Sequence, residues 1–311
     1  MVLESYQIVV LLAIGMLVGI SMSFMAQTGQ SFVIPVVTLM TGNVLLGVAI
    51  NALNDLITAA CVSTSYVRKK QFAIEKKMLG YVAIMLGTSF CGVLLVMTTS
   101  FSNNLGWLLP VLFITFAIFI IKQGFPTAAT IKGTIAKIGM MLARARGDGQ
   151  SRARLKQEIQ KLESMHGKDD GSTIQEIIPR SSTAFYCITI AFAIIIGLFA
   201  GLTGANSGII ITLLLIIVMG YPVKKGVGTA LLISIVICSF TFTCYQLLGV
   251  AIKGHVFIDL EISLFIAIGS MISGFITSSY IQKLSAKKMG RAIAIVMIVL
   301  GSLALAFYFI K

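Results

Sequence analysis

Charged side chains are scarce in this sequence, and those typical of catalysis are scarcer still. Of 311 residues, 11% are charged and 57% are hydrophobic, and histidine occurs twice. Both histidines, His166 and His255, fall in stretches between apolar segments. The five cysteines lie within apolar segments at no spacing typical of metal ligands. There is no nucleotide-binding loop, metal-binding motif or catalytic triad. The sequence therefore predicts a protein that is not an enzyme and that uses no cofactor or metal.

Long apolar runs are what the sequence has in abundance. Runs of about 18 residues or more without charge occur at 8–25, 79–98, 183–200, 228–248, 262–282 and 292–310. This number of runs indicates an all-α polytopic protein of the cytoplasmic membrane, with the lipid bilayer as its surroundings. The alternating pattern of a membrane β-barrel is absent. We expect no cleaved signal peptide, because the first run leads into more membrane sequence.

The formal net charge of +13 could indicate a nucleic-acid partner. However, Lys and Arg lie between the apolar runs or at their ends. This placement is typical of loops that face anionic lipid and the cytoplasm. We therefore predict no nucleic-acid partner. The sequence leaves a homodimer open.

A long polar stretch divides the chain into two apolar parts. We predict a first transmembrane repeat at 1–121 and a second at 181–311. The stretch between them, 122–180, is expected to be a basic cytoplasmic linker with amphipathic helices.

The two apolar parts resemble each other. A constant shift of 178 residues aligns Gly42 with Gly220, and a shift of 182 matches "LGTSFCG" at 86–92 to "IGSMISG" at 268–274. Spacings of small residues are common in membrane helices, so one match is weak. Two matches in the same order indicate an internal repeat.

The positive charges predict that the two repeats have opposite orientations. The loop 66–78 carries five basic residues, whereas its equivalent 249–261 is nearly neutral. Conversely, Lys224 and Lys225 lie in the loop that matches the uncharged 41–46. Positive loops stay in the cytoplasm, so equivalent loops are expected on opposite sides of the membrane. Such inverted repeats are typical of secondary transporters. Equivalent loops lie on opposite sides only if each repeat crosses the membrane an odd number of times. We therefore predict that each repeat is a broken-helix hairpin plus three transmembrane helices.

Each half also contains a helix that is interrupted by small and polar residues. The run after each break is too short to cross a hydrocarbon core of about 30 Å. Irregular backbone is tolerated at that depth where it is buried in protein or lines a watery cavity. Each half-helix N-terminus carries roughly half a positive charge, so the two breaks predict an anion site near the midplane. Tight helix packing is the alternative interpretation. The residues concerned are Gln27, Thr28, Gly29, Gln30 and Ser31 in the first break, and Gly204, Asn206, Ser207 and Gly208 in the second.

Three further polar residues are candidates for the same site. Asp55 is an acidic residue deep inside a predicted crossing, in "NALNDLITAA", next to Asn51 and Asn54. A carboxyl group at membrane depth is costly and usually functional, so we predict that Asp55 couples transport to protons. A hydrogen bond between helices is the alternative. Asn51 and its repeat equivalent Thr229 are expected either to line the cavity or to pack between helices.

The two breaks and their flanks carry a resemblance to a known family. "GLTGANSGIIITLLL" followed by "GYPVKKGVGTALLISI", and the weaker copy "AQTGQSFVIPVVTLMTGNVLLGVAINAL", resemble the TauE/SafE family of sulfite exporters and organosulfonate permeases. The likeness covers both apolar halves and not the linker. It implies export or uptake of a small sulfur-containing anion, such as sulfite or sulfoacetate, and export is the direction that we expect. Asn206 and Ser207 stand where the family more often has glycine.

Other functional classes remain open at this point. An anion channel is one, although two inverted breaks suit alternating access better than a continuous pore. A transporter of another small organic anion is a second. A membrane-embedded enzyme is a third, but it would need a constellation such as His with Asp or Ser at membrane depth, and the sequence places no His there.

Overall fold

The computed structural model describes residues 4–26, 29–99, 183–204 and 208–281, together with the single residues 118, 283, 295, 298 and 302. Every element in these residues is a helix, which confirms the all-α class. The linker 122–180 and the last predicted crossing of each half lie outside the continuous described ranges. The elements are α1 (Ser5–Met25), α2 (Gln30–Thr41), α3 (Val44–Arg68), α4 (Lys76–Thr98), α8 (Thr183–Thr203), α9 (Gly208–Leu213), the π-helical turn η1 (Leu214–Val218), α10 (Val223–Leu248), the π-helical turn η2 (Gly249–Lys253) and α11 (Leu260–Ile281).

Six helices of the described chain are long and apolar enough to cross a membrane: α1, α3, α4, α8, α10 with its continuation η2, and α11. Their outward faces keep large apolar side chains exposed, such as Leu79, Ile195 and Ile276. A helix pairs most of its own backbone N–H and C=O groups, as a hydrocarbon solvent requires. The chain is therefore a multi-pass membrane protein.

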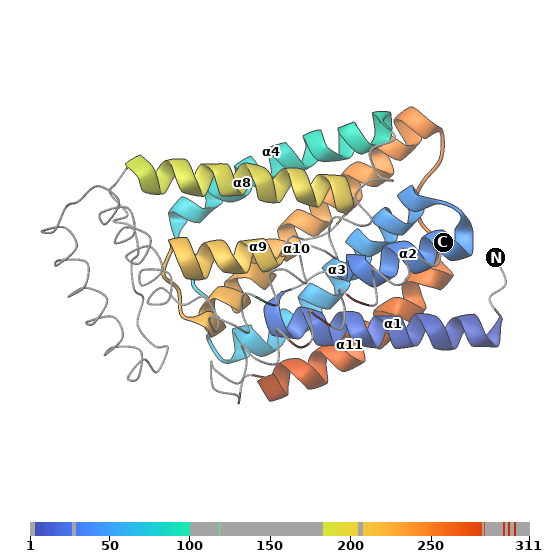
Figure 1. The fold of residues 1–311 in the computed structure, drawn as a ribbon, viewed down its shortest axis with the longest axis horizontal. Coiled ribbons are helices and arrows are strands. Elements are labelled where there is room, and N and C mark those ends of the chain that lie inside the picture. Colours follow the sequence, from blue (N-terminus) through green and yellow to red (C-terminus); the bar gives the residue numbers. More distant parts are fainter. Residues whose placement is uncertain are drawn as a thin grey trace, which may run out of the picture.

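Two helix breaks fall where the sequence predicts them. In Figure 1, α1 runs from one end of the molecule to the middle, and α2 returns to the end where α1 began. The pair α8 and α9 does the same from the opposite end. The breaks turn through left-handed residues, Ala26 with φ 55° after α1 and Gly204 with φ 62° after α8. Both breaks therefore lie at mid-depth.

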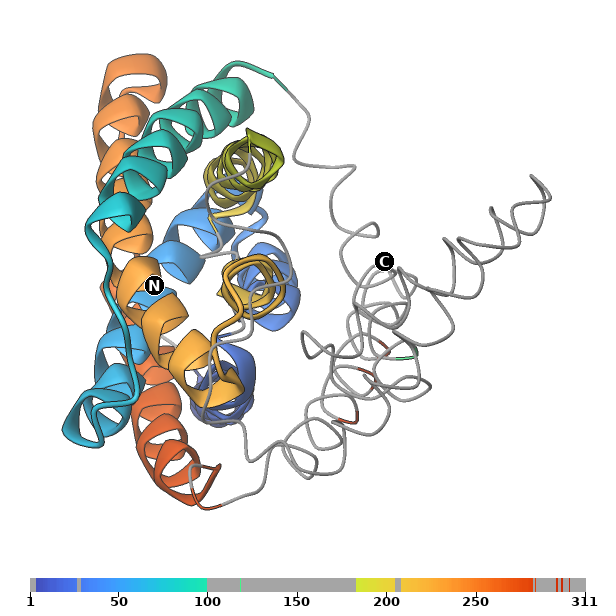
Figure 2. The ribbon, with the colours of Figure 1, turned by 90° about the vertical axis from the view of Figure 1, so that its left-hand side faces the viewer.

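The helices form two layers. Figure 2 shows α1, α2, α8 and α9 nearly end-on, with the tilted helices α3, α4, α10 and α11 along one side of them. The most extensive contacts are α1 with α11, α4 with α8, and α3 with α10. The first helix of each half thus packs against a helix from the other half.

Glycines allow the close approach of these helices. A Cβ atom on Gly15 or Gly19 of α1 would collide with backbone of α11, at the carbonyl groups of Ile266 and Ser270. In the same way, a Cβ atom on Gly201 of α8 would collide with backbone of α4. Close backbone approach at small residues is the usual way in which membrane helices gain packing energy.

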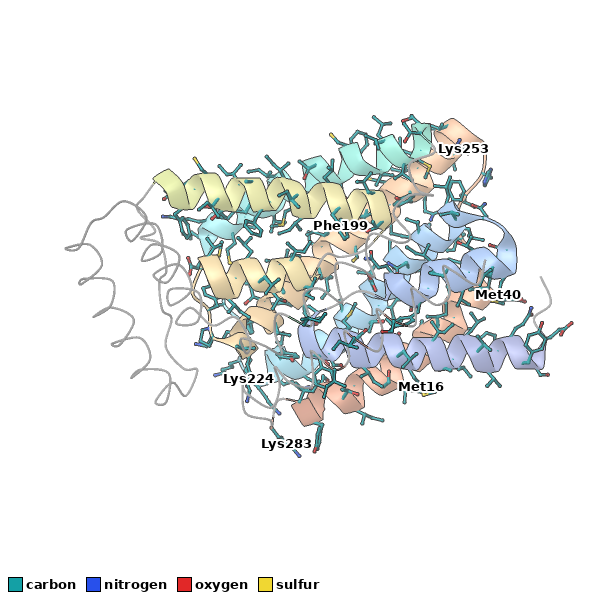
Figure 3. The ribbon with its side chains drawn as sticks, in the orientation of Figure 1. Met16, Met40, Phe199, Lys224, Lys253 and Lys283 are labelled. Carbon is teal, nitrogen blue, oxygen red and sulfur yellow. The ribbon has the colours of Figure 1, made fainter. Side chains whose placement is uncertain are left out.

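Basic residues gather at one end of the described chain. Figure 3 shows Lys224 and Lys283 at the same end of the molecule and Lys253 at the other. The α3–α4 connection lies at the same end as Lys224 (Figure 1). We call this the basic end; its residues are Arg68, Lys69, Lys70, Lys76, Lys77, Lys224, Lys225 and Lys283.

Candidate functional site

The two breaks position the start of two half-length helices. Gly29 is the N-cap residue of α2, and Gly208 is the first residue of α9, which continues into η1. Of the predicted site residues, Gln27, Thr28, Asn206 and Ser207 lie outside the described residues, as does the side chain of Ser31. Gly29, Gln30, Gly204 and Gly208 are buried. The described residues that flank the two breaks are therefore enclosed by protein.

A stripe of polar side chains on α3 lies beside the breaks. Asn51, Asn54, Asp55 and Thr58 recur at intervals of three and four residues, so they share one face of the helix. All four are at most 1% exposed. Because α3 is otherwise largely apolar, this face places hydrogen-bonding groups in the membrane interior.

Asp55 binds the N-terminus of α2. The backbone N–H of Gly29 donates to Oδ1 of Asp55 over 3.1 Å, and Nδ2 of Asn51 donates to Oδ2 over 3.3 Å. A buried carboxyl group must be hydrogen-bonded or neutralised to be tolerated. The start of α2 supplies part of this stabilisation, because the positive end of a helix dipole favours an anion.

Asn51 joins the two breaks. Its Nδ2 also donates to the carbonyl oxygen of Gly204 over 3.1 Å, and Gly204 lies at the second break. The approach is close, because a Cβ atom on Gly204 would collide with the carbonyl oxygen of Val48 on α3. Of the predicted residues, Gly29, Asn51, Asp55 and Gly204 therefore form one hydrogen-bonded group.

Asp55 stands apart from the other charged residues of the described chain. Lys, Arg, His, Glu and the remaining Asp there lie at helix ends or in connections. The thiol of Cys238 on α10 is buried and close enough to Asp55 for an electrostatic interaction. No group of three or more His, Cys, Asp or Glu side chains suited to a metal occurs in these residues. The donors at mid-depth are backbone N–H and amide groups, which suit an oxyanion.

Thr229 lies apart from this group. It is on the first turns of α10, and its hydroxyl group accepts from the N–H of Ala73 over 2.9 Å and donates to the carbonyl oxygen of Ala73 over 3.2 Å. This contact ties the α3–α4 connection to α10 near the basic end. Its role in substrate binding stays a prediction.

Asn54 belongs to the same polar stripe on α3, and sequence reasoning did not assign it to the site. It is 1% exposed, and neither Oδ1 nor Nδ2 has a hydrogen-bond partner. An unpaired buried polar group costs about 1–3 kcal/mol. Its polarity is visible in the sequence, but its lack of a partner depends on how α3 packs against its neighbours.

The comparisons with known proteins agree with this architecture. The family description "Sulfite exporter TauE/SafE" matches residues 11–304, which include both breaks, five of the six crossing helices in full and all of α1 except its first residues. Comparison with curated proteins and with solved structures gives no match. The matched range covers nearly the whole chain, and we conclude that this membrane protein belongs to the TauE/SafE sulfite exporter family of transporters.

Proposed function

We propose that this protein is a secondary transporter that exports sulfite or a small organosulfonate, such as sulfoacetate, across the cytoplasmic membrane by alternating access. The observation that carries the proposal is the position of Asn51, which bonds at once to Asp55 beside the first break and to Gly204 in the second. A site shared by two halves is what an alternating-access mechanism needs, because it can be exposed by moving one half against the other.

An inverted repeat would explain the paired features of the fold. Gly15 and Gly19 of α1 correspond to Gly197 and Gly201 of α8 at a shift of 182 residues. Each pair packs against the fourth helix of the opposite half, α11 or α4, respectively. Such matching contacts are expected when two related halves face each other in opposite orientations.

Two hydrogen bonds also support the proposed repeat relation between the two halves. The hydroxyl group of Tyr66 on α3 donates to the carbonyl oxygen of Ser23 on α1 over 3.0 Å. The hydroxyl group of Tyr245 on α10 donates to the carbonyl oxygen of Gly201 on α8 over 2.6 Å. Tyr66 and Tyr245 are 179 residues apart in the chain, close to the shift that aligns the two halves.

The proposed orientation follows from charge. The basic end holds the basic residues of the α3–α4 connection and of the start of α10, so we place it in the cytoplasm. The opposite end carries Lys253 together with the acidic residues Glu4, Asp259 and Glu261. On this placement α1 begins outside and α8 begins inside.

The proposed binding groups are the N–H groups at the start of α2 and of α9, with Asn51 between them. Gln27, Thr28, Gln30 and Ser31 would complete the first break, and Asn206, Ser207 and Gly208 the second. No Lys or Arg of the described chain lies at mid-depth. Helix N-termini and side-chain amides would therefore bind the anion.

A flux assay in proteoliposomes tests this function. The purified protein is expected to move sulfite or methanesulfonate with saturable kinetics, and unlabelled anion on the far side should stimulate exchange. Chloride flux should be weak. Gly87→Ala is the control variant and should transport as the wild type does, because a Cβ atom there meets nothing within 4 Å. Flux that does not saturate and shows no exchange stimulation would indicate a channel, and an absence of flux for every sulfur anion would refute the proposal.

A further inference from the structure

Asn54 is the polar side chain of the α3 stripe that the contacts above leave without a role. Its two polar atoms are buried and unpartnered, although Asn51 and Asp55 on the same helix face are both hydrogen-bonded. Buried amides in native proteins almost always have a partner, so an unpaired one calls for a bound group that completes it.

The packing of α3 against α2 places Asn54 beside the start of α2. Gly47 of α3 packs directly against Ile34 and Thr38 of α2. One turn further along α3, Ile50 belongs to the same buried cluster as Phe32, which is nearer the start of α2. The helices run antiparallel, so the next turn of α3 comes level with the N-terminus of α2, and this turn carries Asn54.

Two neighbouring contacts agree with this register. Gly29, the N-cap of α2, donates to Asp55, the residue after Asn54. One turn beyond Asn54, the hydroxyl group of Thr58 donates to Oγ of Ser270 on α11 over 2.7 Å. Asn54 therefore faces the interior between the start of α2 and α11.

The start of α2 already has a carboxyl group of the protein as its hydrogen-bond partner. A free helix N-terminus attracts negatively charged groups through its N–H donors and its dipole. Here the Asp55 carboxyl group receives the Gly29 N–H. The residue that aligns with Asp55 in the second half at the shift of 178 is Ile233, and α10 contains no acidic residue. The two breaks are thus chemically unequal.

We propose that the transported anion binds at the N-terminus of α2 between the Gly29 N–H and the Asn54 amide, and that Asp55 is a tethered competitor which holds this position when no substrate is bound. This inference rests on the proposed function and names the side chains that perform it. Substrate entry requires Asp55 to take up one proton from water, which removes its negative charge and weakens its bond to Gly29. Release of the anion returns the proton. One proton therefore moves with each monovalent anion.

Few other groups can supply this pH response in the described chain. The helices packed against α3 are α1, α2, α10 and α11. Their charged residues lie at helix ends, and α2 has none; they are Glu4, Lys224, Lys225 and Glu261. At mid-depth the thiol of Cys238 is the titratable group that interacts with Asp55. A cysteine-to-serine change at this position separates its contribution from that of Asp55.

The test is calorimetric titration of methanesulfonate into the full-length protein in lipid nanodiscs at several pH values between about 5 and 8. Methanesulfonate stays ionised over this range, so a pH response reports the protein. At pH values where Asp55 is ionised, the wild-type affinity for methanesulfonate should rise about tenfold for each unit by which the pH is lowered. Asp55→Asn should bind with an affinity that does not change with pH and that matches the acidic limit of the wild type. Cys238→Ser should keep the wild-type response.

Asn54→Leu gives an independent readout. It should weaken methanesulfonate binding at least tenfold at every pH without lowering the thermal unfolding temperature, because no hydrogen bond of the amide is lost. Ser89→Ala is the control for removal of a buried polar group, since Ser89 bonds to Thr241 between α4 and α10. This variant should bind as the wild type does.

The outcomes separate the inference from the function. Asp55→Asn binding with the wild-type pH response, or Asn54→Leu binding with wild-type affinity, would overturn the inference while transport stands. Wild-type binding that requires Na⁺ and ignores pH would also overturn it, because Asp55 and Asn54 would then hold a cation. If neither methanesulfonate nor sulfite binds at any pH, the proposed function is refuted, and so is the inference, because it rests on that function.

Discussion

Two buried tyrosines make the same contact in the two halves of the chain. Tyr66 and Tyr245 are at most 1% exposed, and each donates its hydroxyl hydrogen to a carbonyl oxygen on the first helix of its half. In an apolar interior such a bond fixes the position of one helix along its neighbour. These two residues therefore hold α3 and α10 in position beside the breaks.

Removal of either hydroxyl group should destabilise the fold by a similar amount. For Tyr66→Phe and Tyr245→Phe we expect a loss of about 1 kcal/mol each in the free energy of unfolding, because each change deletes one buried hydrogen bond at nearly constant volume. Equilibrium unfolding in mixed micelles measures this loss. Tyr280→Phe is the control, since Tyr280 is 65% exposed. A neutral result at both buried positions would mean that these bonds do not hold the helices.

The half-length helices differ from the crossing helices because irregular geometry is built into each of them. Pro35 lies within α2 and removes one backbone donor, and α9 passes into the π-helical turn η1. A glycine with positive φ follows each half-helix: Gly42 (70°) caps α2, and Gly220 (72°) comes directly after Met219, the C-cap of η1. Glycine adopts this conformation at little cost, so the chain can turn sharply into α3 and towards α10.

At the same scale, the glycine contacts predict a strong difference between two faces of α4. Gly92 packs against the backbone of α8 at Leu198 and Gly201, whereas nothing lies within 4 Å of a Cβ atom on Gly87. Gly92→Ala should cost about 1–3 kcal/mol in stability, because the helices must separate. Gly87→Ala should be neutral or stabilising by up to about 1 kcal/mol, because alanine favours the helix.

Thermal unfolding of the two alanine variants in the same detergent makes this comparison directly. Equal unfolding temperatures would show that α4 and α8 adjust freely at their contact. The two changes are chemically identical and lie five residues apart on one helix, so differences in helix propensity cannot explain a gap between them.

At the scale of the whole molecule, the chain sorts its charges between two ends. The basic end contains all but one of the Lys and Arg residues in the described chain, and Lys253 is the exception. Anionic lipid and the positive-inside rule favour this end in the cytoplasm. The orientation of every described helix then follows from the direction of α1.

Cysteine labelling in intact cells checks this orientation. In a cysteine-free background, a cysteine at Asn43 should react with an impermeant thiol reagent from outside. Cysteines at Lys70 and Lys224 should react after permeabilisation, because they belong to the basic end. Lys253→Cys provides a second outside position. Reaction of Asn43→Cys and Lys224→Cys from the same side would contradict the proposed inverted arrangement of the two halves.

The sequence by itself determined the features that depend on local composition. Apolar runs long enough to cross a bilayer predict crossing helices, and small polar breaks followed by short runs predict half-helices, because each depends on residues adjacent in the chain. The described structure confirms the all-α class and the two broken helices. The sequence also singled out Asp55, because a lone carboxyl group in an apolar segment is visible without any fold.

Tertiary structure alone decided what these residues touch. Asp55 meets Gly29 across 26 residues, and Asn51 meets Gly204 across 153, so their hydrogen bonds depend on how α3 packs between the two breaks. The same packing leaves the amide of Asn54 unpaired and directs Thr229 to Ala73. No local pattern contains this information, because a side chain's partner is set by the register and crossing of helices that are distant in the chain.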